Sequence, residues 1–327
     1  MHTRENIERV ERRHELSAEE LEREYIQTGT PVIITGILDT WPAMKCWRDL
    51  AYLKDLGGDR VVPLTHVREG GEYFRVKPVQ TTFSDALDLI FDSAASRPYY
   101  LHEFDLSRAI PALKNDFSFP FPALEHHAIP PNFWIGSGGS ISRLHYDYLQ
   151  NFLAVVRGVK HLYLVSPEQL HRVYALPPYA RKPNFSPVSI VGKTDLQRYP
   201  RAAHVQPLEV IVEEGEVLYN PSMWWHQVTT RGQTIAVNWF WSTPAMKRDE
   251  TDLAACLDAM GTGDLDGCIE RIRALEDPQS RSALRAHVTR ILLNRGARDQ
   301  ARAVWQTIES AKWCAALREL FDGRVST

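Results

Sequence analysis

Hydrophobic and polar positions change their spacing twice along the 327-residue chain and divide it into three parts. Residues 1–95 mix charged helical stretches with short apolar strands, and residues 96–248 carry short apolar runs separated by Gly and Pro turns. The second pattern is typical of a double-stranded β-helix, or jelly roll. Residues 249–327 place Ala, Leu, Arg and Glu at helical spacing and predict three or four helices. The predicted fold is therefore mainly β with α: a double-stranded β-helix core with an N-terminal α/β part and a C-terminal helical bundle.

Several short segments predict individual elements. Ser17 and Glu20 have the spacing of a capping box, residues 31–35 form a compact apolar strand, and residues 83–91 have helical periodicity. Residues 177–206 are too rich in proline for regular structure and too long for a passive connector. We interpret them as an insert over the mouth of the barrel that touches substrate. A surface loop without function is the alternative.

Three residues predict a metal site. His145 and Asp147 are two positions apart, so both side chains point to one face of an extended strand. His226 follows two tryptophans, where extended structure restarts after a proline turn. Two histidines and one carboxylate are the ligands of the non-haem Fe(II) facial triad, which leaves adjacent positions free for a co-substrate and oxygen. Because a packed core histidine explains either half alone, the prediction depends on finding both halves together.

A lysine lies inside an apolar run shortly after the first ligand pair. Gly158 divides residues 151–167 into two apolar runs, which predicts a β-hairpin in the barrel wall, and Lys160 falls within the second run. Burying a lysine there is costly unless an anion pairs with it, and the distal carboxylate of 2-oxoglutarate is such an anion. The alternative is a lysine that extends from an edge strand into solvent.

These residues resemble a known family, the JmjC-type, cupin-fold 2-oxoglutarate oxygenases. Residues 145–160, HYDYLQNFLAVVRGVK, are similar along their whole length to the small JmjC hydroxylases, the group of the asparaginyl hydroxylase that inhibits hypoxia-inducible factor. The segments GTPVIITG at 29–36 and YPRAA at 199–203 also resemble the family. The resemblance covers about residues 15–245 and implies the cupin form of the double-stranded β-helix.

The resemblance implies roles for five further residues. In that family the residues that match Lys160, Ser142 and Tyr100 hold the far carboxylate of 2-oxoglutarate. Those that match Asn151 and Asn238 lie near its metal-chelating end. The implied cofactor is Fe(II), with 2-oxoglutarate as co-substrate and O2 as oxidant, and the products are succinate, carbon dioxide and a hydroxylated substrate. We expect no catalytic residue beyond the metal ligands, because such enzymes act mainly by positioning and by excluding water.

Four functions remain open for such a site. A dioxygenase that hydroxylates an amino-acid side chain of a protein or peptide is favoured, because the resemblance is greatest to the small JmjC hydroxylases. An N-methyl-lysine demethylase uses the same chemistry, but no cysteine-rich zinc module is apparent. A tRNA-base hydroxylase is supported only by arginines near the C-terminus. A non-enzymatic cupin-like metal-binding protein would not need Lys160 and Ser142 in register with the triad.

Composition adds limits on partners and location. The net charge of -3 gives no electrostatic argument for nucleic acid. The four cysteines have no paired spacing, which is typical of free thiols in a reducing compartment. No signal peptide and no apolar stretch of ~18 residues are apparent. We therefore expect a cytoplasmic protein without a membrane partner, or a nuclear one if the source is eukaryotic.

The C-terminal part raises a question of assembly. Its apolar positions need a covering surface, either in a homodimer, as related hydroxylases form with C-terminal helices, or on the barrel of the same chain. Arginines between Arg271 and Arg302 form either a basic face for RNA or, more commonly, a solvated helix surface. We expect this part to serve assembly and not chemistry. The apolar positions are Ile272, Leu275, Leu284, Val288, Ile291 and Leu292.

Overall fold

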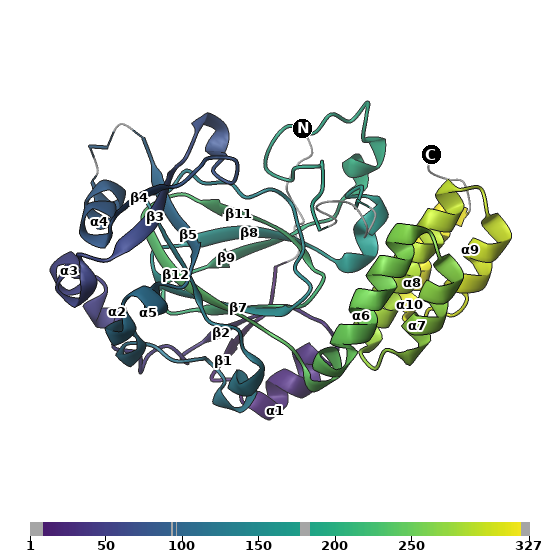
Figure 1. Ribbon diagram of the computed structural model, residues 1–327, viewed down its shortest axis with the longest axis horizontal. Coiled ribbons are helices and arrows are strands. Elements are labelled where there is room, and N and C mark those ends of the chain that lie inside the picture. Colours follow the sequence, from purple (N-terminus) through teal and green to yellow (C-terminus); the bar gives the residue numbers. More distant parts are fainter. Residues whose placement is uncertain (1–8, 93, 96, 177–183, 322–327) are drawn as a thin grey trace.

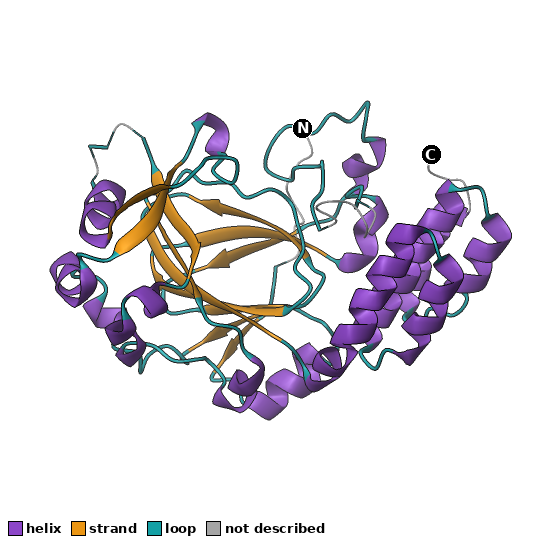
Figure 2. Ribbon diagram, viewed as in Figure 1, coloured by secondary structure: helices purple, strands orange, loops and turns teal. Residues whose placement is uncertain are grey.

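The computed structural model describes residues 9–92, 94–95, 97–176 and 184–321. Strands form two facing sheets, and the C-terminal helices stand together at one end of this sandwich (Figures 1 and 2). The predicted cupin-like β core with α/β elements before it and helices after it is confirmed. None of the described helices combines the length and the apolar composition that a membrane span requires.

The strands of the described residues belong to a large and a small sheet. In spatial order the large sheet contains β1 (Arg12–His14), β2 (Val32–Thr35), β10 (Val217–Asn220), β7 (Gln150–Arg157), β12 (Thr234–Trp241), β6 (Asn132–Gly136), β5 (Tyr99–Phe104), β3 (Val61–His66) and β4 (Val79–Thr82). The small sheet contains β11 (Trp225–Thr230), β8 (Lys160–Val165) and β9 (Leu208–Val212). Strands β1, β2, β3 and β4 come from the N-terminal part, so that part helps to build the same large sheet.

The helices fall into two groups. The first group is α1 (Ala18–Leu21), α2 (Ala43–Cys46), α3 (Leu50–Gly57), α4 (Phe83–Phe91) and α5 (Leu106–Ala109). The C-terminal group is α6 (Pro244–Thr262), α7 (Leu265–Ala274), α8 (Pro278–Asn294), α9 (Arg298–Trp305) and α10 (Ala311–Phe321). Three local predictions are confirmed: the capping box at Ser17, the strand at β2 and the helix at α4, whose bounds are those predicted.

Strand alternation decides which residues face the space between the sheets. In β7, Phe152 and Ala154 pack into the core on the helix-covered side of the large sheet. The residues that alternate with them, Asn151 and Leu153, line a cavity on the other side. A strand places successive side chains on opposite faces, so one register fixes both the core and the site.

The predicted hairpin at Gly158 is wrong. Strand β7 pairs with β10 and β12, whereas β8 pairs with β11 and β9. The chain therefore crosses from the large sheet to the small one at Gly158, whose φ of 79° is left-handed. A glycine between two apolar runs is common to a hairpin and to such a crossover, and only long-range pairing distinguishes them.

The C-terminal group contains five α-helices within the described residues, more than the three or four predicted. Its predicted apolar positions are all buried, and they pack in a core built of the group's own helices. A second core joins Trp313 of α10 to Tyr146 and Trp225, which flank the predicted metal ligands. The predicted apolar positions are thus covered by other residues of the same chain. They give no support to a homodimer, which stays a prediction.

Several of the C-terminal arginines contact their own chain. Arg281 and Arg285 lie 3.1 and 3.3 Å from the carboxylate of Glu309. Arg290 donates to the backbone oxygens of Ala175 and Leu176. These guanidinium groups therefore connect elements within the molecule, which weakens the case for a basic face that binds RNA.

Candidate metal and co-substrate site

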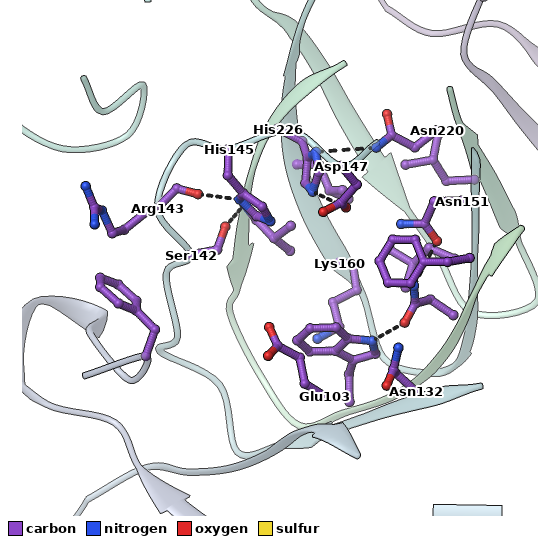
Figure 3. Close-up of a pocket in the computed structure, with 18 of the residues that line it drawn as sticks. Glu103, Asn132, Ser142, Arg143, His145, Asp147, Asn151, Lys160, Asn220 and His226 are labelled. Atoms are coloured by element: carbon purple, nitrogen blue, oxygen red, sulfur yellow. Dashed lines mark hydrogen bonds and ion pairs between the residues drawn. The ribbon is translucent and has the colours of Figure 1, made fainter. Parts of the chain in front are cut away.

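The three predicted metal ligands meet at one end of the small sheet (Figure 3). His226 lies in β11, and His145 and Asp147 lie in the connection between β6 and β7. That connection forms isolated bridges and not the regular strand that the spacing suggested: in one of them His145 N donates to His226 O at 3.1 Å, and His226 N donates to His145 O at 2.6 Å. One ligand atom from each residue lies within 4.8 Å of the others.

Hydrogen bonds fix which nitrogen of each histidine faces the centre. Nδ1 of His145 lies 2.7 Å from the carbonyl oxygen of Arg143, and Nδ1 of His226 lies 3.0 Å from that of Trp224. A carbonyl oxygen only accepts, so each Nδ1 carries the proton and each Nε2 is left with its lone pair. Nε2 of His226 lies 3.4 Å from Oδ2 of Asp147. Burial lowers the pKa of His145 to about 4, which keeps its ring neutral as ligation requires. This donor set of two nitrogens and one carboxylate fits Fe(II).

Lys160 lies in the same cavity and is 1% exposed. It belongs to the central strand of the small sheet, which excludes the alternative of an edge lysine extended into solvent. Its Nζ lies 3.2 Å from the hydroxyl of Tyr100 and 3.3 Å from Oγ1 of Thr230. Burial lowers the pKa of Lys160 to about 7. Among the described residues no carboxylate pairs with this ammonium, so the cavity offers a place for an anion.

The other predicted co-substrate residues line the same cavity of about 500 Å³. Ser142 Oγ accepts a hydrogen bond from Val228 N at 2.8 Å. Asn238 Nδ2 donates to Asn151 Oδ1 at 2.9 Å, and the indole of Trp134 donates to Asn238 Oδ1 at 2.7 Å. The cavity volume lies within the range typical of small-molecule sites. All five residues predicted to contact 2-oxoglutarate are therefore brought together with the triad.

Several residues that line the cavity or contact Lys160 were not predicted from the sequence. Thr230 lies four positions after His226 in the same strand, so strand periodicity alone places it on the same face. Glu103 lines the cavity from β5, where the pairing register shifts and its φ is 50°. No sequence pattern marks such a bulge. Phe185 belongs to the proline-rich insert, and its ring stacks 5.4 Å from that of His145.

The described part of the insert thus reaches the cavity through Phe185, while its predicted contact with substrate stays a prediction. Residues 177–183, which carry most of its prolines, lie outside the described residues.

Comparison with known proteins gives a family for this arrangement. A family model described as a cupin-like domain matches residues 18–247. The lysine-specific demethylase JMJ30 of Arabidopsis thaliana is 34% identical over 247 residues, which are 72% of this chain and 56% of that protein. The Jumonji C domain-containing protein 5 of Drosophila melanogaster is 29% identical over 237 residues, which are 69% of this chain and 58% of that protein. The chain spans just over half the length of these two relatives.

A third relative has a name of a different kind. The tRNA wybutosine-synthesizing protein 5 of Homo sapiens is 27% identical over 264 residues, which are 74% of this chain and 81% of that protein. These relatives support the predicted family, but they do not show the particular closeness to the asparaginyl hydroxylase that we expected. Because the family match includes the whole triad and Lys160, the chain belongs to the cupin-like domain family, as a relative of Jumonji C proteins.

Proposed function

We propose that this protein is an Fe(II)- and 2-oxoglutarate-dependent dioxygenase that hydroxylates an amino-acid side chain of a protein or peptide. The observation that carries the proposal is that a complete His145, Asp147 and His226 triad shares one cavity with a buried, uncompensated Lys160. Iron, when bound there, would supply the oxygen chemistry by which 2-oxoglutarate, O2 and a C–H bond become succinate, carbon dioxide and a C–OH group.

The chain's own contribution is to bind and orient. Lys160 and the hydroxyls of Tyr100 and Thr230 form a polar group inside an otherwise apolar strand environment, suited to one carboxylate. Ser142 and the Asn151–Asn238 pair supply further polar atoms between Lys160 and the triad. These groups support the proposal that a five-carbon diacid binds with one end at the lysine and its 2-oxo acid end at the triad.

A protein or peptide substrate is favoured by the wall opposite the triad. Figure 3 shows Glu103 across the cavity from His226 and Asp147. Its left-handed φ of 50° is unusual for glutamate and re-aims the side chain at a bulge beside the site. Tyr73, Phe74 and Trp134 line the same cavity. A carboxylate beside aromatic rings suits a basic side chain such as lysine or arginine.

A tRNA base is the second candidate, because one relative is named for wybutosine synthesis and aligns over most of its length. Glu103 argues against it, since a carboxylate in the cavity repels phosphate groups that follow a base. Demethylation of an N-methyl-lysine uses the same site and differs only in the atom that is oxidised.

Mass spectrometry separates these functions. Purified protein with Fe(II), 2-oxoglutarate and air would be incubated with cell-derived peptides, proteins or tRNA, with Asp147→Ala as the matched control. We expect a mass increase of about 16 on peptides, since one oxygen atom is inserted. A loss of about 14 would indicate demethylation, and a change confined to tRNA would replace the proposal with the second candidate. Failure to consume 2-oxoglutarate in any mixture would favour a cupin-like binding protein.

A further inference from the structure

Besides Glu103, the described residues that line the cavity include a second charged side chain that neither the proposed metal site nor the co-substrate uses. Arg143 lines the cavity two residues before His145. Its carbonyl oxygen accepts the Nδ1 proton of His145, so its backbone is fixed relative to the triad. Figure 3 shows its side chain directed away from His226 and Asp147. The guanidinium can therefore contact a substrate group that neighbours the reacting one, and not the reacting group itself.

Two aromatic rings hold the guanidinium of Arg143. Its central carbon lies 5.6 Å from the ring centre of Phe74 and 5.1 Å from that of Phe185. Contacts of this kind restrict a long side chain while its N–H groups, which lie in the guanidinium plane, stay available for an acceptor. Its hydrogen bond in the described structure is a long one, 3.4 Å from Nη2 to the carbonyl oxygen of Ser186.

The charges around Arg143 leave it without a counter-ion. Among the described residues no carboxylate lies within ion-pair distance of it, and the nearby Glu72 lies 3.5 Å from the guanidinium of Arg75 instead. Burial, and then Arg75, lower the pKa of Arg143. A partly buried guanidinium with free in-plane donors is the usual receptor for a carboxylate or phosphate.

We propose that Arg143 binds the side-chain carboxylate of an aspartate or glutamate that neighbours the hydroxylated residue in a peptide substrate. This specificity site rests on the proposed function. Residues two apart in an extended chain are separated by about 7 Å, and we expect the acidic residue within three positions of the target. A single carboxylate fits better than nucleic acid, because Glu72 lies near the same guanidinium, Glu103 lines the same cavity, and both oppose a chain of phosphates.

The test uses pairs of peptides that differ only in charge. Each peptide has a central lysine or arginine, and each pair carries Asp or Asn, or Glu or Gln, at one position within three residues of the centre. Binding is measured without oxygen by fluorescence anisotropy on Mn(II)- and 2-oxoglutarate-loaded full-length protein, and oxidation is measured in air with Fe(II). At one position we expect the acidic peptide to bind about tenfold more tightly than its amide.

Variants connect that preference to Arg143. Arg143→Gln is expected to reduce the ratio between the affinities for the acidic and the amide peptide to about twofold or less, because one charge-assisted bond is lost. Arg143→Glu should prefer a lysine at the same peptide position. Arg75→Gln is the matched control, because Arg75 is an exposed guanidinium nearby that lacks the aromatic contacts, and it should keep the ratio.

Two results would overturn the inference in different ways. Wild-type protein that oxidises acidic and amide peptides equally, or an Arg143→Gln variant that keeps the preference, contradicts the role of Arg143 and leaves the proposed function intact. Consumption of 2-oxoglutarate with no peptide bound or oxidised contradicts the peptide function itself, and the specificity site fails with it.

Discussion

Burial lowers the pKa of both His145 and Lys160, but the consequence differs: it suits a neutral metal ligand and disfavours an isolated ammonium. Both histidines donate Nδ1–H to a carbonyl oxygen two residues upstream, and burial keeps His145 neutral, so their Nε2 atoms are prepared for a metal. Lys160 is also buried, but it lacks any compensating charge in the described structure, and its pKa falls to about 7. The surroundings of Lys160 are therefore unfavourable for an isolated charge, and an incoming carboxylate relieves this cost.

At the metal, Asp147→Ala is expected to abolish turnover, because it removes the only anionic ligand of the triad. The measurement is bound iron per protein together with succinate formation. Asp59→Ala is a suitable control, since that carboxylate is 86% exposed and lies outside the cavity. Full iron-dependent turnover by the Asp147 variant would show that the metal lies elsewhere.

At the lysine, Lys160→Met should raise the 2-oxoglutarate requirement far more than the iron requirement. Loss of a buried charge-assisted bond costs about 2–5 kcal/mol, which is some tens to thousands of fold in affinity. Lys247→Met, at a lysine that is 59% exposed on α6, is the control. Equal increases in both requirements would contradict a contact between Lys160 and the co-substrate.

The pH dependence of 2-oxoglutarate binding follows from the same residue. The pKa of free Lys160 is lowered to about 7, whereas a bound carboxylate favours the ammonium form. Binding above that pH must therefore take up a proton, and affinity should fall by up to about tenfold per pH unit. Titration calorimetry in buffers of different ionisation enthalpy measures this uptake. Affinity that stays constant from pH 7 to pH 9 would contradict the assignment.

Strands explain why distant residues converge on one site. The side chains of His226, Val228 and Thr230 alternate with Trp225 and Gln227 along β11, and Lys160 opens the neighbouring β8 opposite Thr230. Positions that are in phase along one strand are predictable because strand period two acts locally, whereas Asn151 and Asn238 were expected only from the family resemblance. The sheet that each strand joins was not predictable. Pairing between residues far apart in sequence decides it, and the hairpin prediction at Gly158 failed for that reason.

The crossover itself can be tested through its glycine. A Cβ at Gly158 would collide with the backbone oxygen of Gln233, and the φ of 79° disfavours any side chain. We expect Gly158→Ala to lower the free energy of unfolding by about 1–3 kcal/mol and to weaken 2-oxoglutarate binding through Lys160. Gly232→Ala is the control, because nothing lies within 4 Å of the position that its added methyl group would take. An unchanged free energy of unfolding for Gly158→Ala in chemical denaturation would show that a side chain at this position causes no backbone strain.

At the scale of the molecule, the C-terminal helices support the ligand-bearing segments. Tyr146 lies between the two ligands of the first pair, Trp225 precedes His226, and both pack in one core with Ala283 and Trp313 from the C-terminal group. Packing on the barrel of the same chain was one of the two covers considered, but the sequence did not show that the contact would lie beside the metal ligands. Amphipathic spacing shows that a helix face is covered, but it does not name the surface that covers it.

This contact predicts a difference between two cavity-forming substitutions. Trp313→Ala should lower the free energy of unfolding by about 3–5 kcal/mol and also weaken metal binding in the protein that remains folded. Met260→Ala removes a buried side chain from the core that lies within the C-terminal group, so it should destabilise without changing metal affinity. Denaturation and metal titration on the same samples provide both readouts. Equal metal affinity in both variants would show that the two parts are independent.

The central claim is that one cavity holds iron through the triad and 2-oxoglutarate through Lys160. Its most direct test is an anaerobic titration of the Fe(II)-loaded protein with 2-oxoglutarate, monitored by the visible charge-transfer absorption of a 2-oxo acid chelated to Fe(II). We expect saturation at one equivalent in the wild type, no band in Asp147→Ala, and the same band at much higher 2-oxoglutarate in Lys160→Met. A wild-type protein that binds Fe(II) but gives no such band, or a Lys160→Met variant with unchanged affinity, would contradict the claim.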